Sequence, residues 1–153
     1  MSDIHILSRS FRELNTGELY EMLALRTDIF VVEQECAYPE LDFQDQHARH
    51  ILLYKNKTLA AYARVLPPDT VYKEPSIGRV AVSFNFRGKG LARKVFEMAL
   101  SELESSYPDS IIKLQAQTYL EEFYTRYGFK RTTEPYPCLL YTSDAADDRR
   151  GGL

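Results

Sequence analysis

Four residues, Arg87-Gly88-Lys89-Gly90, stand where a strand pattern changes into a helix pattern. The strand pattern is the alternating "VAVSF" that begins at Val80, and the helix pattern is "LARKVF". Glycines let the backbone approach an oxygen-rich group, and N–H groups at the start of a helix attract negative charge. Arginine and lysine add positive charge. This corner therefore predicts a cradle for a phosphate group.

The standard nucleotide motifs do not fit this corner. A P-loop has two glycines five positions apart, followed by Lys and Ser or Thr, and a dinucleotide site has three glycines. Gly88 and Gly90 are two positions apart, and no hydroxyl residue follows them directly. What remains is the pattern Arg87-x-x-Gly90-x-Ala92. By itself it is also compatible with a plain surface turn.

Composition limits the class of protein. The chain has 153 residues, enough for one domain with a sizeable core, and a net charge of −3 argues against general nucleic-acid binding. The first residues lack a signal peptide's apolar segment, and no apolar run is long enough to span a membrane. Cys36 and Cys138 match no metal-binding spacing, and we expect both to be reduced. We expect a cytoplasmic monomer or homodimer without metal, nucleic-acid or membrane partners.

The first half of the chain predicts strands around one helix. Ile4 to Phe11 alternates loosely and predicts a strand. Asn15, with Glu18 three residues later, predicts a capping box that opens a helix ending near "IFVV". After an irregular, acid-rich segment, "HILLYKNKTLAAYARVL" predicts two strands with a turn at Asn56.

The second half alternates strands and helices. "SIGRVAVSF" predicts a strand, and the helix after Gly90 carries one apolar face, with Leu91, Val95 and Ala99. "IIKLQAQ" predicts a further strand, followed by a short helix with a second capping box from Thr118. "FKRTTEPY" predicts a last strand. The order β-α-(α)-β-β-β-α-β-α-β predicts one mixed α/β domain.

Several segments together resemble the GNAT (GCN5-related) N-acetyltransferase superfamily, whose Arg/Gln-x-x-Gly-x-Gly/Ala motif matches the corner. "AYARVL", "IGRVAVS", "RGKGLARKVF" and "LQAQTYLEEFYTRYGF" follow one another in the order of that superfamily's core. "LRTDIFVVEQECAYPELDFQD" and "RHILLYKN" resemble its ElaA-like branch. The resemblance implies the GNAT acyl-CoA N-acyltransferase fold (α+β), a mixed central sheet with helices on both faces, over residues 1–137.

The resemblance also implies an activity. Such proteins are acetyl-CoA-dependent N-acyltransferases, and here an acetyl group would pass directly to a primary amine of a small molecule, a peptide or a protein. The alternative is a non-catalytic acyl-CoA-binding module or an inactive truncated fragment. The coenzyme-binding residues that it implies are Val80, Ala81, Val82, Arg87, Gly88, Lys89, Gly90, Leu91 and Ala92.

Acetyl transfer needs a neutral amine, donors for an oxyanion and a proton for the departing thiolate. By resemblance, the strand at Val80 diverges from its neighbour, and Val82 donates its backbone N–H to the oxyanion. Tyr124, in "FYTRYGF", stands where this superfamily places a tyrosine that protonates the thiolate. A phenol is neutral at pH 7 and donates one hydrogen bond. A packing role in the core is the alternative for Tyr124.

The acceptor side stays open at the sequence level. Glu33 follows "FVV" where the amine would enter, and it would bind the ammonium, help to remove its proton, or simply be a solvated acid. Asp42 and Asp45 would line a cation-attracting pocket or solubilise a loop. His50 is a further substrate-side candidate, with a satisfied core or surface histidine as the alternative. Arg64 faces either solvent or the cleft.

The last stretch, Cys138 to Leu153, does not resemble the end of a GNAT domain. Its first ten residues, "CLLYTSDAAD", match the translation of a transposase sequencing adapter. We therefore expect residues 138–153 to be a non-native tail on a C-terminally truncated domain, with the final strand missing or replaced. "CLLYT" is apolar enough to enter the resulting gap, and residues from about Ser143 onward are expected to be unpacked.

Overall fold

The structure is a computed structural model that describes residues 3–37, 39–117, 121–131 and 142–147. Within them, seven strands form one mixed sheet in the order β1-β2-β3-β4-β5-β7-β6. The strands are β1 (Ile4–Ser10), β2 (Arg49–Lys55), β3 (Thr58–Leu66), β4 (Ser76–Val82), β5 (Ile112–Gln117), β6 (Phe129–Arg131) and β7 (Thr142–Asp147). The helices are α1 (Thr16–Thr27), the π-helix η1 (Asp28–Glu33), the 3-10 turns η2 (Asp45–His47) and η3 (Phe84–Phe86), α2 (Leu91–Ser106) and α3 (Glu121–Thr125).

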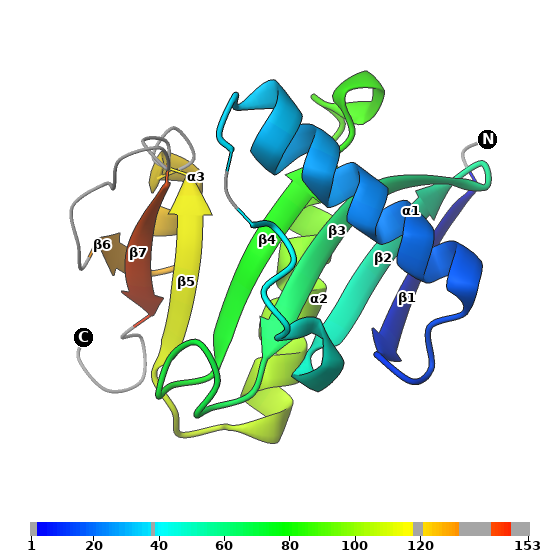
Figure 1. Cartoon of the computed structure of the whole chain (residues 1–153). Helices are drawn as coiled ribbons and strands as arrows, with labels where there is room; N and C mark the ends of the chain where they lie inside the picture. The colour runs from blue at the N-terminus through cyan, green and yellow to red at the C-terminus, as the bar shows by residue number, and fades with distance from the viewer. Residues whose placement is uncertain (1–2, 38, 118–120, 132–141, 148–153) are drawn as a thin grey trace.

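The two long helices cover opposite faces of the sheet. Figure 1 shows α1 crossing the near face over β2 to β4, with α2 behind the same strands. On the α1 face, Met22 and Ile29 pack with Tyr62 of β3. On the α2 face, Val95 and Phe96 are fully buried in a second core cluster. The predicted mixed sheet with helices on both faces is confirmed.

Two local predictions are confirmed at element ends. At the start of α1, Asn15 accepts from the Glu18 N–H at 2.7 Å, and Glu18 accepts from the Asn15 N–H at 3.1 Å, which completes the capping box. Between β2 and β3, Asn56 and Lys57 have φ of 50° and 70°. A two-residue hairpin with positive φ at both positions matches the twist of its strands.

A cluster of aromatic rings fixes α3 against α2. The Phe96 ring of α2 lies 5.1 Å from the Tyr124 ring, 6.1 Å from the Phe123 ring and 5.7 Å from the Phe129 ring, centroid to centroid. Gly128, with φ of 93°, turns the chain from α3 into β6. This packing holds α3 beside the end of the sheet where β4 finishes.

The final strand was predicted to be missing or replaced, and the structure has a strand in this place. Thr142–Asp147 forms β7, which pairs antiparallel with β5 along its whole length and with β6. The chain is therefore not unpacked from Ser143 to Asp147. The physical reason is that ladder hydrogen bonds join backbone groups, so any extended segment satisfies the edge that β5 would otherwise expose. The expected cap at Thr118, Cys138 and the remainder of the tail lie outside the described residues.

Candidate functional site

A cavity opens where β4 and β5 separate. These parallel strands pair only at Ser76↔Lys113 and Ile77↔Leu114, and Figure 1 shows them diverging toward their C-terminal ends. The cavity has a volume of about 270 Å³. Eight of the nine predicted coenzyme-binding residues line it: Val80, Ala81, Val82, Arg87, Gly88, Gly90, Leu91 and Ala92. Its other lining residues, which the sequence did not identify, are Ile29, Phe86, Arg93 and Phe123.

The turn before α2 is shaped to receive an anion. Gly88 and Gly90 have φ of 77° and 76°, a left-handed conformation that favours glycine. A Cβ atom built on either glycine meets no other atom within 4 Å, so the space beside the turn is open. Among the described residues, no side chain caps the start of α2, and its first turn carries no acid. The first N–H groups of α2 are thus available to a ligand, and the helix dipole favours a negative charge there.

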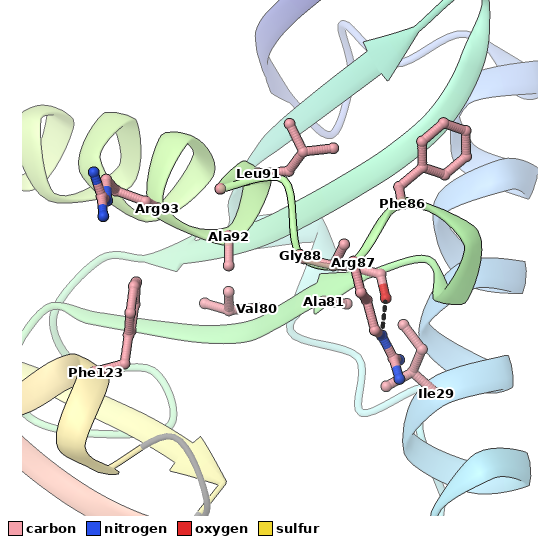
Figure 2. A pocket seen from close by; sticks show the side chains of 12 residues that line it. Ile29, Val80, Ala81, Phe86, Arg87, Gly88, Leu91, Ala92, Arg93 and Phe123 are labelled. Carbon is pink, nitrogen blue, oxygen red and sulfur yellow. Dashed lines mark hydrogen bonds between the residues drawn. The ribbon is translucent and has the colours of Figure 1, made fainter.

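Figure 2 shows how this turn, β4 and α3 surround the cavity. Val80 points toward Ala92, and Phe123 of α3 lies on the other side of Val80 from Arg87. Arg87 extends along the mouth toward Ile29. The predicted coenzyme residue Lys89 is exposed and does not line the cavity. The lining is therefore mainly apolar apart from the glycine turn and two arginines, which Figure 2 shows on opposite sides of Ala92.

The backbone of Val82 faces the side from which β5 has diverged. Ser83 N–H donates to the Ala60 carbonyl at 2.8 Å, and the next pair in the ladder is Ala61↔Val82. Hydrogen-bonded and non-hydrogen-bonded pairs alternate in an antiparallel ladder. The N–H and C=O of Val82 therefore point away from β3. Its carbonyl accepts from Arg87 Nε at 3.0 Å, the dashed line of Figure 2.

Glu33 lies beside the cradle and pairs with Arg87. The two guanidinium N–H groups donate to the two carboxylate oxygens at 2.7 and 2.8 Å. This hydrogen bonding lowers the pKa of Glu33, although partial burial opposes the effect. The Arg87 guanidinium also lies over the Phe84 ring, 5.6 Å from its centroid. The π-helix η1, which continues α1, ends at Glu33 and brings this acid to the cavity mouth.

Tyr124 is buried under the aromatic cluster. Its side chain is 3% exposed, and its ring packs against Phe96 and Phe123. Phe123, its neighbour in sequence, is the residue of α3 that lines the cavity. The nearby Tyr127 hydroxyl donates to Glu97 at 3.2 Å. The acid role of Tyr124 therefore stays a prediction.

Asp42 and Asp45 lie in a second, buried set of ion pairs. Arg26 and Arg64 donate to Asp45 at 2.8 and 3.0 Å, and Arg64 also donates to both oxygens of Asp42 at 2.8 Å. Burial raises the pKa of Asp42, but hydrogen bonding and charge from Arg64 outweigh it and hold the pKa at about 2. Arg64, which the sequence left open, is 2% exposed. We call this set the arginine network; its members are Arg26, Glu40, Asp42, Asp45, Arg64 and Arg79.

His50 is a core histidine attached to this network. It is 0% exposed, with Nδ1 2.6 Å from the Tyr62 hydroxyl and Nε2 2.9 Å from the Asp45 carbonyl. Because a carbonyl only accepts, Nε2 carries the proton and Nδ1 accepts from Tyr62. Burial lowers the pKa of His50 to about 4. The structure thus groups His50 with Asp42 and Asp45, but it places all three away from the cavity lining.

Sequence reasoning missed a bulge in β4. Between the pairs Tyr62↔Ala81 and Arg64↔Gly78 there is one residue on β3 but two on β4, Arg79 and Val80. Arg79 has φ of 55°, which is uncommon for a residue other than glycine. Position 79 itself is neither Gly nor Asn, but Gly78 stands directly before it inside the strand pattern. A glycine within a strand often marks a bulge, so this residue was the local signal that could have revealed it.

The described part of the chain has neither a membrane-spanning helix nor a metal-binding cluster. None of its helices combines the length and apolarity that crossing a membrane requires. None of its clusters gathers three His, Cys, Asp or Glu side chains in a way that suits a metal ion.

Comparison with known proteins identifies relatives. The sequence matches the family model of the acetyltransferase (GNAT) domain over residues 22–137. It is 40% identical to the protein ElaA of Escherichia coli over 126 residues, covering 81% of this chain and 82% of that protein. It is 39% identical to a UPF0039 protein of Synechocystis over 127 residues, covering 82% of each.

Solved structures agree with this result. The fold superposes on the crystal structure of E. coli ElaA with a TM-score of 0.86 and 36% identity, covering 94% of this chain and 99% of that one. An acyl-CoA N-acyltransferase from Pseudomonas aeruginosa gives a TM-score of 0.86 at 35% identity, with the same coverage.

Proposed function

This chain belongs to the GNAT acetyltransferase family and is ElaA-like, and on that basis we propose that it moves an acetyl group from acetyl-CoA directly to a primary amine. The acceptor is a small molecule or an exposed amino group of a peptide or protein. The observation that carries the proposal is the cavity between the diverging strands β4 and β5, closed at one end by the glycine turn.

The residues around the cavity fit the parts of acetyl-CoA. The pyrophosphate would lie on the turn from Arg87 to Ala92, where N–H groups and the α2 dipole favour negative charge. Arg93, near the start of α2, also lines the cavity and adds a second positive charge. The apolar walls at Val80 and Phe123 suit the pantetheine arm and the acyl group.

The reaction requires little beyond orientation and two proton transfers. The neutral amine attacks the thioester carbonyl carbon, an N–C bond forms, and the carbonyl oxygen becomes an oxyanion. Val82 N–H, which points away from β3, would donate to that oxyanion. When the C–S bond breaks, the thiolate takes a proton from Tyr124, and the former amine loses a proton to Glu33 directly or through water.

The first experiment measures thiol release from acetyl-CoA with a panel of polyamines, amino acids and peptides. Acceptor-stimulated release supports the enzyme. Tight acetyl-CoA binding without any stimulated release would instead support the alternative of a non-catalytic acyl-CoA-binding module.

A second arm tests Tyr124 with a matched control on the neighbouring turn. Tyr124→Phe removes one hydroxyl, so kcat should fall by roughly 10²–10⁴-fold while the affinity for coenzyme A is kept. Tyr127→Phe removes a hydroxyl that is bonded to Glu97, and kcat should stay within about twofold. Equal kcat values for the two variants would leave Tyr124 a packing residue.

A further inference from the structure

The bulge in β4 decides where Val82 points. Before the bulge, Arg64 lies opposite Gly78; after it, Tyr62 lies opposite Ala81. Without the extra residue, the first register would continue and set Val82 opposite Ala60. Ser83 occupies that place instead and donates to the Ala60 carbonyl at 2.8 Å. The bulge therefore turns the Val82 N–H out of the β3 ladder and toward the diverging side.

Arg79, inside the bulge, is held by side chains on both flanks. Its Nε donates to Glu40 Oε2 at 2.7 Å, and one terminal nitrogen donates to the Glu40 carbonyl at 3.4 Å. The other terminal nitrogen donates to Gln115 Oε1 of β5 at 3.2 Å. Gln115 follows Leu114, the last β5 residue paired with β4. The Arg79 guanidinium thus bridges the two strands at the point where they separate.

Glu40 is fixed from the opposite side by α1. Arg26 Nε donates to the same Glu40 Oε2 at 2.8 Å, and Arg26 also donates to the Glu40 carbonyl at 3.3 Å. The side chains of Arg26 and Glu40 are 0% and 2% exposed, and that of Arg79 is 10% exposed. A buried, charge-assisted chain of contacts therefore runs from α1 through the loop at Glu40 to the bulge.

We propose that Arg79, held by Glu40, is a positioning residue for acyl transfer: its guanidinium holds the β4 bulge in the register that directs the Val82 N–H into the cavity. The proposal rests on the proposed function for its catalytic part. A left-handed conformation at an arginine is strained and persists where surrounding contacts over-determine it. Here the contacts of Arg79 with Glu40 and Gln115 hold the residue in this conformation.

The test separates the effect of losing the guanidinium contacts from the effect of backbone strain at residue 79. Arg79→Gly accepts the positive φ and removes the side chain, so the variant should fold. Amide hydrogen exchange in peptides that cover β4 should become about tenfold faster or more, because the contacts of Arg79 with Glu40 and Gln115 no longer oppose local opening of the strand. With an acceptor identified by the thiol-release panel, kcat should fall by roughly 10²-fold, as for a displaced oxyanion donor. The Kd for coenzyme A should stay within about threefold, because the glycine turn is untouched.

Two companion variants sharpen the result. Lys57→Gly removes a side chain at another positive-φ position, in the β2–β3 turn, and should leave the β4 exchange and kcat unchanged. Arg79→Lys keeps a cation for Glu40 but lacks the fork that also reaches Gln115, so its kcat and exchange should be intermediate. If Arg79→Gly does not fold, Arg79→Lys supplies the same readouts.

Each outcome decides the matter. Unchanged β4 exchange overturns the proposal, as does a parallel fall of kcat, coenzyme affinity and melting temperature, which marks a merely structural role. A third outcome is that the parent protein releases no thiol from acetyl-CoA with any acceptor while β4 exchange rises in Arg79→Gly. That result would support the role of Arg79 in holding the bulge and would reject the proposed function.

Discussion

Two sets of arginine–carboxylate contacts lie near the diverging strands, and they differ in exposure. At the cavity mouth, Arg87 and Glu33 form one bidentate pair whose side chains are 34% and 44% exposed. Under the loop that follows α1, the arginine network joins three arginines to three carboxylates, with Arg26 at 0% and Asp45 at 8% exposure. The chemical groups are the same, but one set is largely exposed to solvent and the other is buried.

This difference in exposure indicates different roles, ligand binding for the exposed pair and structural support for the buried network. An exposed pair is weak and screened by salt, so a phosphate ligand can compete for its arginine at little cost. A buried pair that loses one partner leaves an unpaired charge in a medium of low dielectric, which is strongly unfavourable. The Glu33–Arg87 pair therefore suits a site that responds to a ligand. The arginine network suits a part that must keep one geometry.

The largest expected effect is on stability when the buried set is broken. Arg26→Met keeps much of the volume but leaves one carboxylate in excess around Glu40 and Asp45. The free energy of unfolding should fall by about 3–5 kcal/mol, measured by urea denaturation at neutral pH. The matched change in the exposed pair, Arg87→Met, should cost at most about 1 kcal/mol. Equal losses in the two variants would contradict the comparison.

The second effect is a pH dependence that comes from His50, which contacts the buried arginine network through Asp45. Burial lowers the pKa of His50 from 6.5 to about 4. A lowered folded-state pKa means that stability is complete above pH 6.5 and is lost as the pH falls toward 4. This contribution amounts to about 3 kcal/mol. Protonation would also force the Tyr62 hydroxyl, which now donates to Nδ1, to turn away.

The measurement is urea denaturation at several pH values between 6.5 and 4. His50→Gln removes the titrating group, so its stability should vary less over this range than that of the parent protein. Below pH 4, protonation of Asp42, with its pKa of about 2, adds a separate loss, so the comparison ends above that point. Equal slopes for the parent and the variant would show that His50 is not buried neutral.

The same contrast explains what the sequence could predict. The cradle is local: the glycines, the cations and the start of α2 are neighbours in the chain, so their spacing was readable. The arginine network joins Arg26, Glu40 and Arg79, which no periodicity connects. The direction of Val82 depends on strand register, which a single extra residue changes. β7 was missed because backbone pairing at a sheet edge needs no particular side chains.

The third effect tests the cradle as a binding surface. Gly90→Val should raise the Kd for coenzyme A by an amount worth about 1–3 kcal/mol, because a branched side chain obstructs the approach of pyrophosphate to the N–H groups. Isothermal titration calorimetry measures it. Gly90→Asn separates obstruction from strain, since asparagine tolerates a positive φ. Gly17→Ala, a glycine replacement in α1, serves as the control. A folded Gly90→Asn protein with unchanged affinity would reject the cradle.

The smallest effect is the most specific to the exposed pair. In Glu33→Gln, Arg87 loses the carboxylate that neutralises it, so its charge becomes fully available to the pyrophosphate. Coenzyme A should bind more tightly, by a few-fold, which corresponds to less than about 1 kcal/mol for an exposed pair. The gain should shrink between about 0.1 M and about 1 M salt, where the Debye length falls from about 10 Å to about 3 Å. Calorimetry at the two salt concentrations gives both results.

Glu35→Gln is the matched control for this prediction. It removes the same charge two residues away, and none of the described ion pairs joins Glu35 to Arg87. A gain confined to Glu33→Gln means that the two ligands of the proposed reaction are coupled through one arginine, since coenzyme binding that draws Arg87 away frees Glu33 for the amine. An equal gain in coenzyme A affinity in both variants would show that the effect comes only from the change in net charge. Weaker binding in Glu33→Gln would reverse the argument: the carboxylate would then be orienting Arg87 for the phosphate rather than competing with it.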